Sequence, residues 1–350
     1  MAEVIDATLF GLINDYFRTY LTKQRNCSPH TIRSYQATIE AFLDFAKEQH
    51  GVSLSALNFE ILDSKMLDKY LDSMEAAGCS ISTRNQRHIC IRAFFSYAAK
   101  TDSTTMVYKK NISEVPLKHL AKPNTLKHMS EKATAALLEQ PDPLTRKGLR
   151  DRFILSLLYD SAARNQELID LRLSDIRLGK MPVISIRHGK GDKARNVPLM
   201  KQTVEHFLNY KQVFHPGEDT YSDCPLFYTL RYGKKEPLDN STVRKLVVSY
   251  GEAARKRCAE VPKRVTTHTL RHSRAMHLYQ HGMDLVLIAQ WIGHARLETS
   301  LIYAYADTEQ KRKAIGMATP KNSPLRKKLN SNRYAVTDDE ILKKLYGIKD

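Results

Sequence analysis

Apolar residues recur three or four positions apart along most of this chain, a spacing typical of one face of an α-helix. The first hundred residues contain four such runs, and Ser28 with Pro29 supplies an N-cap and a first-turn proline for the second. Gly51 and Gly78 follow the second and third runs, where glycine commonly ends helices. The sequence therefore predicts a four-helix N-terminal unit, with helices over residues 6–24, 29–50, 64–77 and 83–99.

The helical spacing gives way to a clear strand pattern between residues 181 and 199. Residues 181–186 are apolar and β-prone, Gly-Lys-Gly-Asp at 189–192 has strong turn chemistry, and an extended pattern resumes at 195–199. We predict one β-hairpin here. Glycine (14) and proline (13) are scarce in the 350 residues, so we expect a mainly α fold with a small β-hairpin, an α+β class. The other predicted helices cover residues 130–138, 148–162, 166–171, 204–214, 240–260, 270–282, 285–292 and 309–317.

The length of the chain suggests two or three domains, at roughly 150 residues per domain. Residues 115–127 have no clear period and are rich in lysine and proline, which is typical of a basic linker. We therefore predict an N-terminal domain over 1–114, the linker over 115–127 and a second domain over 128–320. A basic tail over 321–350 would contain a short amphipathic helix at 338–345.

The formal net charge of +17 indicates a polyanionic partner. Nucleic acid is the first candidate, an anionic membrane surface is the second, and a merely soluble basic protein is the third. No apolar stretch is long enough to span a bilayer, and no signal peptide is evident. The five cysteines include no CxxC pair, so we expect neither disulfides nor a zinc knuckle, and we expect a cytoplasmic protein.

Four segments of the second domain contain groups suited to phosphate chemistry. Arg164 follows an apolar helix, Lys190 lies between two glycines in the hairpin turn, His268 and Arg271 share a helix face, and Tyr303 follows a Gly-His pair. An arginine suits bidentate contact with phosphate oxygens, and a lysine on a turn can reach into a DNA groove. A tyrosine beside such cations can attack phosphorus as a nucleophile.

Several of these residues also have an ordinary structural interpretation. Arg164 could pair with Glu167 on the surface, and Lys190 could be a solvated turn residue, with Lys193 and Arg195 as competing cations in the same hairpin.

Tyr303 could simply pack in a core, and the two histidines of the third segment raise the alternative of a metal. His268 and His272 have the i, i+4 spacing of a metal-binding pair. Thr269 stands where a metalloprotease has glutamate, however, and no third ligand is evident, so we expect no metal there.

Taken together, the four segments resemble the tyrosine recombinases, the phage-integrase family. They are YDSAARNQEL at 159–168, GKGDKARNVPL at 189–199, HTLRH at 268–272 and GHARLETSLIY at 293–303. The family patterns that they resemble, in the same order, are Y-x-T-G-x-R-x-x-E-L, G-K-G-x-K-x-R-x-V-P-L, H-x-L-R-H and G-H-x-x-x-x-T-x-x-x-Y. The resemblance extends from about residue 28 to 317 and identifies the N-terminal unit as a SAM-like core-binding domain.

The resemblance implies how a DNA phosphate would be attacked. Tyr303 would form a 3′-phosphotyrosyl link, with Lys190 as general acid for the leaving 5′-oxygen and His268 as general base. Two departures stand out. Tyr305 adds a second phenol where the family often has histidine, and Ala162 replaces the usual glycine. Neither a metal nor another cofactor would be needed.

The resemblance also implies how the phosphate would be held. Arg164 and Arg271 would bind its non-bridging oxygens, where negative charge gathers in the transition state. His294 would add a hydrogen bond, and Glu167 would orient the cluster.

Double-stranded DNA is the partner that charge and resemblance both predict. The family also implies a homo-oligomer, with a dimer on each site and a tetramer in synapsis, and accessory proteins are an open possibility. We expect no membrane partner. The candidates for DNA contact outside the catalytic set are Arg84, Asn85, Arg87, Lys193 and Arg195.

Other functions with related features are a type IB topoisomerase and a catalytically inactive DNA-binding regulator. The small N-terminal domain argues against the first, and the complete catalytic set argues against the second. Within the recombinases, phage integrase, transposase and Xer-like resolvase stay open. The tail after residue 317 favours integration or transposition of a mobile element.

Overall fold

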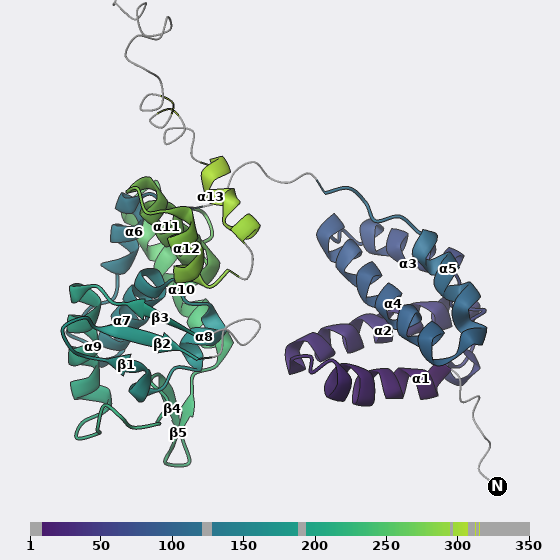
Figure 1. Cartoon of the computed structure of the whole chain (residues 1–350), viewed down its shortest axis with the longest axis horizontal. Coiled ribbons are helices and arrows are strands. Elements are labelled where there is room, and N and C mark those ends of the chain that lie inside the picture. The colour runs from purple at the N-terminus through teal and green to yellow at the C-terminus, as the bar shows by residue number, and fades with distance from the viewer. Residues whose placement is uncertain are drawn as a thin grey trace, which may run out of the picture. The chain divides into compact units, whose positions relative to one another are not determined.

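The computed structural model of this chain describes residues 9–120, 128–187, 194–294 and 297–306, together with Arg312 and Ile315. The chain forms two compact units, Met1–Lys122 and Pro123–Asp350, which Figure 1 shows. Both units are mainly helical, and in the described residues strands occur in the second unit only. The predicted fold class is thus confirmed.

The N-terminal unit contains the four predicted helices and one more. The additional helix is α5, which the sequence did not reveal because it lacks an apolar stripe. Met106 and Val107 are exposed, and Ile112 is the one buried residue of this helix. The helices of the unit are α1 (Leu9–Asp15), continuing into a π-helical segment (Tyr16–Gln24), α2 (Pro29–His50), α3 (Ser64–Ala76), α4 (Ile81–Thr101) and α5 (Met106–Glu114).

Both ends of α2 follow the signals in the sequence. Ser28 Oγ accepts a hydrogen bond from the backbone N–H of Thr31, as an N-cap residue does, and Pro29 occupies the first turn. Gly51 ends the helix in the left-handed conformation, with φ +63°. The cap residues therefore define this helix as predicted.

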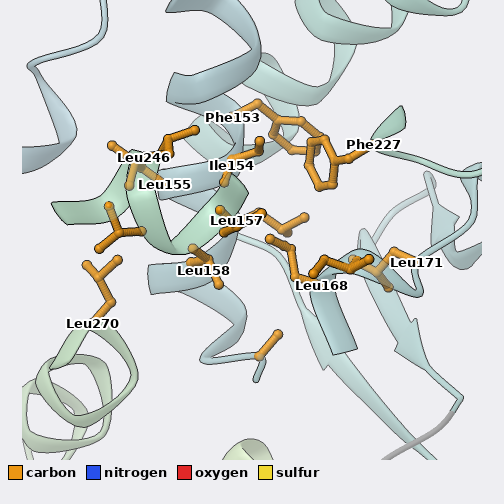
Figure 2. Close-up of a cluster of buried hydrophobic side chains, with 14 of the residues drawn as sticks. Phe153, Ile154, Leu155, Leu157, Leu158, Leu168, Leu171, Phe227, Leu246 and Leu270 are labelled. Atoms are coloured by element: carbon orange, nitrogen blue, oxygen red, sulfur yellow. The ribbon is translucent and has the colours of Figure 1, made fainter. Parts of the chain in front are cut away.

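The second unit is built around α7, whose C-terminal half is buried on nearly every side. Figure 2 shows five of its residues, all fully buried, packed with leucines and a phenylalanine from other segments of the unit. Because α7 is the centre of the core, its C-terminal end is a rigid base for the residues that follow it. The helices are α6 (Glu131–Leu138), α7 (Arg146–Ser161), α8 (Asn165–Ile169), α9 (Lys201–Phe214), α10 (Asn240–Arg257), α11 (Thr267–Gln280), α12 (Leu285–Ile292) and α13 (Leu301–Ala306).

Two small antiparallel sheets belong to this unit. The predicted hairpin is present as β2 (Val183–Ile186) and β3 (Arg195–Pro198), with β1 (Ile176–Arg177) added on the free edge of β2. A second hairpin, which the sequence did not predict, is formed by β4 (Tyr228–Arg231) and β5 (Lys234–Pro237). Most residues of this second hairpin are exposed, so it has no apolar alternation for a sequence pattern to reveal.

Several predicted segments lie outside the residues that the structure describes. They are the hairpin turn at 189–192, nearly all of the helix at 309–317, the tail helix at 338–345 and the last part of the linker. In the part of the chain that is described, no helix is both long and apolar enough to cross a bilayer.

Candidate active site

Arg164 lies where the chain turns from α7 into α8. Ala162 ends α7 in the left-handed conformation, with φ +50°, and Arg164 is the N-cap residue of α8. The backbone N–H of Arg164 donates to Glu167 Oε2 (2.9 Å), and its Nη1 donates to Oε1 (2.6 Å). Left-handed backbone costs a non-glycine residue roughly 1–2 kcal/mol. Ala162 thus holds a turn that the family's usual glycine would adopt more easily.

Glu167 is the buried carboxylate that joins two arginines. Arg195, from β3, donates from Nη2 to Oε2 (2.7 Å) and from Nη1 to Oε1 (3.2 Å) of this carboxylate, which also receives the Arg164 bonds. Burial raises the pKa of Glu167, but Arg195, and then Arg164, outweigh it and hold the pKa at about 2. Glu167 is therefore ionised at neutral pH and orients both guanidinium groups.

Arg195 lies mostly inside the second unit. Its side chain is only 9% exposed, and its Nε donates to the backbone carbonyl of Trp291 (3.0 Å). The structure thus gives Arg195 an internal partner, the buried Glu167, that the sequence did not predict, and DNA contact by Arg195 stays a prediction. No local pattern could reveal this pairing, since the two partners are 28 residues apart.

Arg271, on α11, is held by backbone carbonyls on two sides. Its Nη1 donates to Ala162 O (2.6 Å) and its Nη2 donates to Ile292 O. Arg164 Nη2 donates to the next carbonyl, that of Gly293 (3.0 Å). The C-terminal end of α12 thus receives two cations on consecutive carbonyls, which favours their binding there. These bonds fix the two arginines relative to each other.

Gly293 ends α12, and the turn that it forms places His294 near Arg164 and Arg271. It has φ +67°, a conformation that favours glycine, and a Cβ at this position would lie 2.8 Å from Arg195 Nη1. A side chain here would be strained and would collide with Arg195. The Gly-His pair of the sequence motif is thus explained by backbone conformation and by close packing.

Tyr303, on α13, is fully buried beside two histidines. Its hydroxyl lies 3.1 Å from His272 Nδ1, and its ring lies parallel to that of His294, with centroids 6.4 Å apart. Burial raises the pKa of Tyr303 to about 12, although the charge of Arg271 acts in the opposite direction. At neutral pH the phenol therefore keeps its proton and needs a base before it can attack.

The histidines of the site are neutral in this structure at pH 7. Burial lowers the pKa of His272 and of His294 to about 4, and the charge of Arg271 contributes to both shifts. The pKa of His268 is also lowered, by desolvation and then by Arg271, although its side chain is exposed overall. A neutral imidazole can accept a proton, and a bound phosphate anion would raise these pKa values.

Ser300 sets the orientation of His294. Its hydroxyl, fully buried, lies 2.8 Å from His294 Nδ1. When Nδ1 accepts from Ser300, the proton of the neutral ring is on Nε2, which can then donate to a phosphate oxygen. The SLIY segment thus supplies both the tyrosine and the residue that orients its neighbouring histidine.

The structure brings most of the predicted catalytic set into one part of the second unit. His272, which the sequence analysis considered only as part of a metal-binding pair, was not in the predicted catalytic set, although it stands inside the HTLRH motif and next to Arg271. Lys190 and Lys193 lie outside the described residues. The residues brought together are Arg164, Glu167, His268, Arg271, His294 and Tyr303.

The three DNA-contact candidates of the N-terminal unit lie on α4, and two of them are buried. Arg84 (4% exposed) pairs with Glu75 at 2.7 Å, and Asn85 (7% exposed) donates to the carbonyl of Lys118 (2.7 Å). Arg84 is thus paired with Glu75 on α3, and Asn85 is held by the backbone of Lys118. DNA contact by either residue stays a prediction. Arg87 is half-buried and donates to the Tyr70 hydroxyl (2.6 Å).

We expect Glu167→Gln to lower the free energy of unfolding at pH 7 by about 3–5 kcal/mol, because it leaves two arginines without their buried carboxylate. The pH dependence of the free energy of unfolding should change too. A carboxylate whose pKa is lowered by folding stabilises the protein above its ordinary pKa, and that stability is lost as the pH falls toward the folded value. The wild type should therefore lose about 3 kcal/mol more than the variant between pH 5 and pH 2.

Urea unfolding of the full chain, followed by Trp291 fluorescence, measures this effect, because Trp291 is the chain's one tryptophan and its carbonyl accepts from Arg195. Glu205→Gln, at an exposed site on α9, is the matched control and should change stability by less than about 0.5 kcal/mol. Equal acid sensitivity of Glu167→Gln and the wild type would refute this account of the carboxylate.

Comparison with known protein families identifies both units. Residues 127–310 match the phage integrase family, and residues 13–102 match the phage integrase N-terminal SAM-like domain. The first match covers the whole candidate active site, and the second covers most of the helical N-terminal unit.

Two curated relatives match nearly the full chain. An integrase/recombinase of Sinorhizobium fredii, y4rC, is 31% identical over 316 residues, covering 90% of this chain and 92% of the relative. The tyrosine recombinase XerD of Staphylococcus aureus is 28% identical over 319 residues, covering 89% of this chain and 99% of the relative.

Two solved structures show the same fold. The XerH recombinase in a post-cleavage complex with palindromic difH is 25% identical, with a TM-score of 0.61 and coverage of 88% of each chain. The Tn1549 transposon integrase (residues 82–397) with circular intermediate DNA is 17% identical, with a TM-score of 0.64 and coverage of 87% of this chain and 98% of that one. The family matches, supported by the S. fredii relative, show that this chain belongs to the phage integrase family of tyrosine recombinases, enzymes that cut and rejoin DNA strands.

Proposed function

We propose that this protein is a site-specific recombinase in which Tyr303 is the nucleophile. Its phenolic oxygen attacks a DNA phosphorus, the bond to the 5′-oxygen breaks, and a 3′-phosphotyrosyl link forms. A 5′-hydroxyl from a partner strand then attacks that link, the phosphodiester is restored and the tyrosine is released. The observation that carries the proposal is the burial of the Tyr303 phenol among neutral histidines, with Arg271 close enough to act on its pKa.

The two arginines would hold the phosphate during both steps. Both are fixed on carbonyls at the end of α12, and the Arg164 side chain keeps 22% of its surface exposed. Arg271 is buried, and burial, followed by the charge of Arg164, lowers its pKa to about 10, so it stays charged at neutral pH. Two preorganised cations stabilise the charge that develops on the non-bridging oxygens. The role of Lys190 as general acid rests on the sequence motif.

In this structure Tyr303 is withdrawn, because a buried hydroxyl cannot reach a DNA backbone. We propose that His272 holds the phenol in this resting position, and that α13 moves when DNA binds. His268, one helical turn earlier on α11 and exposed, would then accept the phenol proton. In this proposal His272 holds Tyr303 before DNA binds, and His268 deprotonates Tyr303 for attack.

The different roles proposed for His268 and His272 predict unequal effects of their alanine variants on the rate of cleavage. His268→Ala should slow single-turnover cleavage by about 10²–10⁴-fold, the usual contribution of a general base. His272→Ala should slow it by less than about tenfold, because the resting contact is given up before attack. Rates are measured with excess enzyme on a nicked suicide substrate, whose short 5′ fragment diffuses away. If His272→Ala proves the slower variant, His272 is the base.

We expect the covalent adduct to form in EDTA without added nucleotide. The proposed site supplies positive charge through arginines, and the reaction conserves the energy of the phosphodiester in the tyrosyl link. Gel analysis of the suicide reaction, with and without chelator, tests the expectation. A requirement for Mg²⁺ that restores an activity lost in EDTA would contradict the proposed chemistry.

We propose that both units, 1–114 and 128–320, bind double-stranded DNA, with the basic linker 115–127 on the duplex and a tetramer as the active assembly. The charge of +17 supports a DNA partner. Lys193 and Arg87 stay candidates for phosphate contact. The protein would act in the cytoplasm, in keeping with cysteines that are all free in the structure.

We propose mobile-element DNA as the substrate, with integration or transposition as the outcome. The 31% identity to an integrase/recombinase and the basic tail beyond the family match support this choice. The alternative is a chromosome resolvase, which the likeness to XerD over 99% of that protein favours. Sequencing the DNA covalently trapped on the protein in cells decides between them. Ends of an element support integration, whereas one fixed chromosomal site supports resolution.

A further inference from the structure

A second cluster of reactive side chains lies at the end of α9, outside the catalytic set. His215, 1% exposed, follows this helix directly, and Glu218 and Cys224 come from the loop that leads toward β4. His215 Nδ1 lies 3.1 Å from Glu218 Oε2 and 3.6 Å from Cys224 Sγ, and the thiol lies 2.8 Å from the same carboxylate oxygen. An imidazole nitrogen, a carboxylate oxygen and a sulfur thus face one another.

The hydrogen bonds of His215 leave two acceptors facing each other. Its Nε2 lies 3.0 Å from the carbonyl of Leu226, which can only accept, so Nε2 carries the proton. In the neutral ring Nδ1 then presents a lone pair to an oxygen of the Glu218 carboxylate, which is ordinarily ionised at neutral pH. Two lone pairs 3.1 Å apart repel unless a positive centre lies between them. That centre is either a proton or a metal ion.

The spacing of the three atoms fits a tetrahedral zinc ion. With Zn–N and Zn–O near 2.0–2.1 Å and Zn–S near 2.3 Å, the ligand atoms of a tetrahedron lie about 3.3–3.6 Å apart. The distances from His215 Nδ1, 3.1 and 3.6 Å, are close to these values. The Cys224–Glu218 contact of 2.8 Å, which the thiol proton bridges, would open by roughly 0.7 Å when a metal replaces that proton.

The surroundings supply the outer contacts that metal ligands usually have. The Leu226 carbonyl that fixes His215 also accepts from the Tyr210 hydroxyl (2.7 Å). Lys235, on β5, donates to Glu218 Oε1 and leaves Oε2 facing the other two ligand atoms. A histidine held by a carbonyl and a carboxylate held by a donor are common outer-shell features of metal sites.

We propose that His215, Glu218 and Cys224 bind a zinc-class divalent cation, with water as the fourth ligand. The Cys224 thiol releases its proton to solvent as the sulfur–metal bond forms. Nitrogen and sulfur ligands select such an ion over Mg²⁺ or Ca²⁺, which prefer oxygen. The metal would tie the end of α9 to the loop before β4 and, through Lys235, to the β4–β5 hairpin. Figure 1 shows this hairpin at the opposite end of the unit from α12 and α13, so we assign this metal no part in DNA strand cleavage.

Titration of the metal-free full-length protein with Co²⁺ tests the proposal. We expect one Co²⁺ per chain, with a thiolate-to-cobalt charge-transfer band and the visible bands of a four-coordinate ion, and Zn²⁺ should displace it. Cys224→Ser should lose the charge-transfer band and bind Zn²⁺ at least ~10–100-fold more weakly, since loss of an outer-shell partner alone has that effect. Cys79→Ser, which removes a partly buried cysteine of the N-terminal unit, should keep both properties.

Glu218→Ala is a second variant, at a side chain that is 29% exposed, and is used if Cys224→Ser fails to fold. It should weaken Zn²⁺ binding but keep the charge-transfer band, because the thiolate remains. Absence of the band in the wild type would mean that a proton bridges His215 and Glu218, and the proposal would be wrong. A band that persists in Cys224→Ser would place the metal on another cysteine and also overturn it. Identifying Tyr303 as the residue that carries DNA in the covalent adduct tests the recombinase mechanism separately.

Discussion

Tyr303→Phe should abolish covalent capture of DNA and leave DNA binding within a few-fold of the wild type. The substitution removes only the hydroxyl, and the ring can keep its buried position beside His294. Without the phenolic oxygen no phosphotyrosyl link can form, so we expect a loss on the order of 10⁴-fold or more, as for other lost nucleophiles. Adduct formation on a nicked suicide substrate and gel-shift affinity are measured side by side.

Tyr305→Phe is the matched control, since it removes the other phenol two residues along the chain. It should form the adduct at a rate within a few-fold of the wild type. Capture by Tyr303→Phe together with failure of Tyr305→Phe would assign the nucleophile to Tyr305. Loss of DNA binding by Tyr303→Phe would instead indicate a structural role for the buried ring.

Lys190→Ala should be rescued by a 5′-bridging phosphorothiolate substrate, whereas Arg164→Ala should not. The sulfur leaves without a proton, so a missing general acid no longer matters, and the rescue should be about 10²–10⁴-fold. Arg164 instead holds non-bridging oxygens that the sulfur does not replace, and its guanidinium is fixed on Glu167 and on the carbonyl of Gly293. Single-turnover cleavage of the oxygen and sulfur substrates by each variant gives the comparison.

Lys193→Ala is the control for this experiment, because it removes a neighbouring cation of the same hairpin. Rescue of Lys193→Ala in place of Lys190→Ala would move the general acid three residues along. Absence of rescue in both would mean that the hairpin lysines only bind DNA.

The helices could be predicted because their signals are local, and the grouping of the catalytic candidates was implied by the resemblance to a known family. The cap residues Ser28 and Gly51 mark the two ends of α2. The glycine of the Gly-His pair before Tyr303 marks the left-handed end of α12. Local signals failed where the partner is distant in sequence. Arg195 resembles any exposed hairpin cation until the buried Glu167 is placed beside it.

The same reason explains two further differences between sequence and structure, whereas the β4–β5 hairpin was missed for a different one. Arg84 is buried and forms an ion pair with Glu75, which lies on another helix. The spacing of basic residues along α4 could not predict that ion pair. The β4–β5 hairpin has no apolar alternation because most of its residues are exposed. His215 and Cys224 are nine residues apart, without a CxxC pair, so only the fold brings them together.

Mapping the residue that carries the DNA tests the central claim most directly. The covalent adduct from a suicide substrate is digested with protease and nuclease, and the nucleotide-bearing peptide is sequenced by mass spectrometry. We predict a single modified residue, Tyr303, linked to a 3′-phosphate, with a free 5′-hydroxyl on the released strand. A nucleotide on Tyr305 or on any other side chain, or a 5′-phosphate link with a free 3′-hydroxyl, would contradict the proposed mechanism.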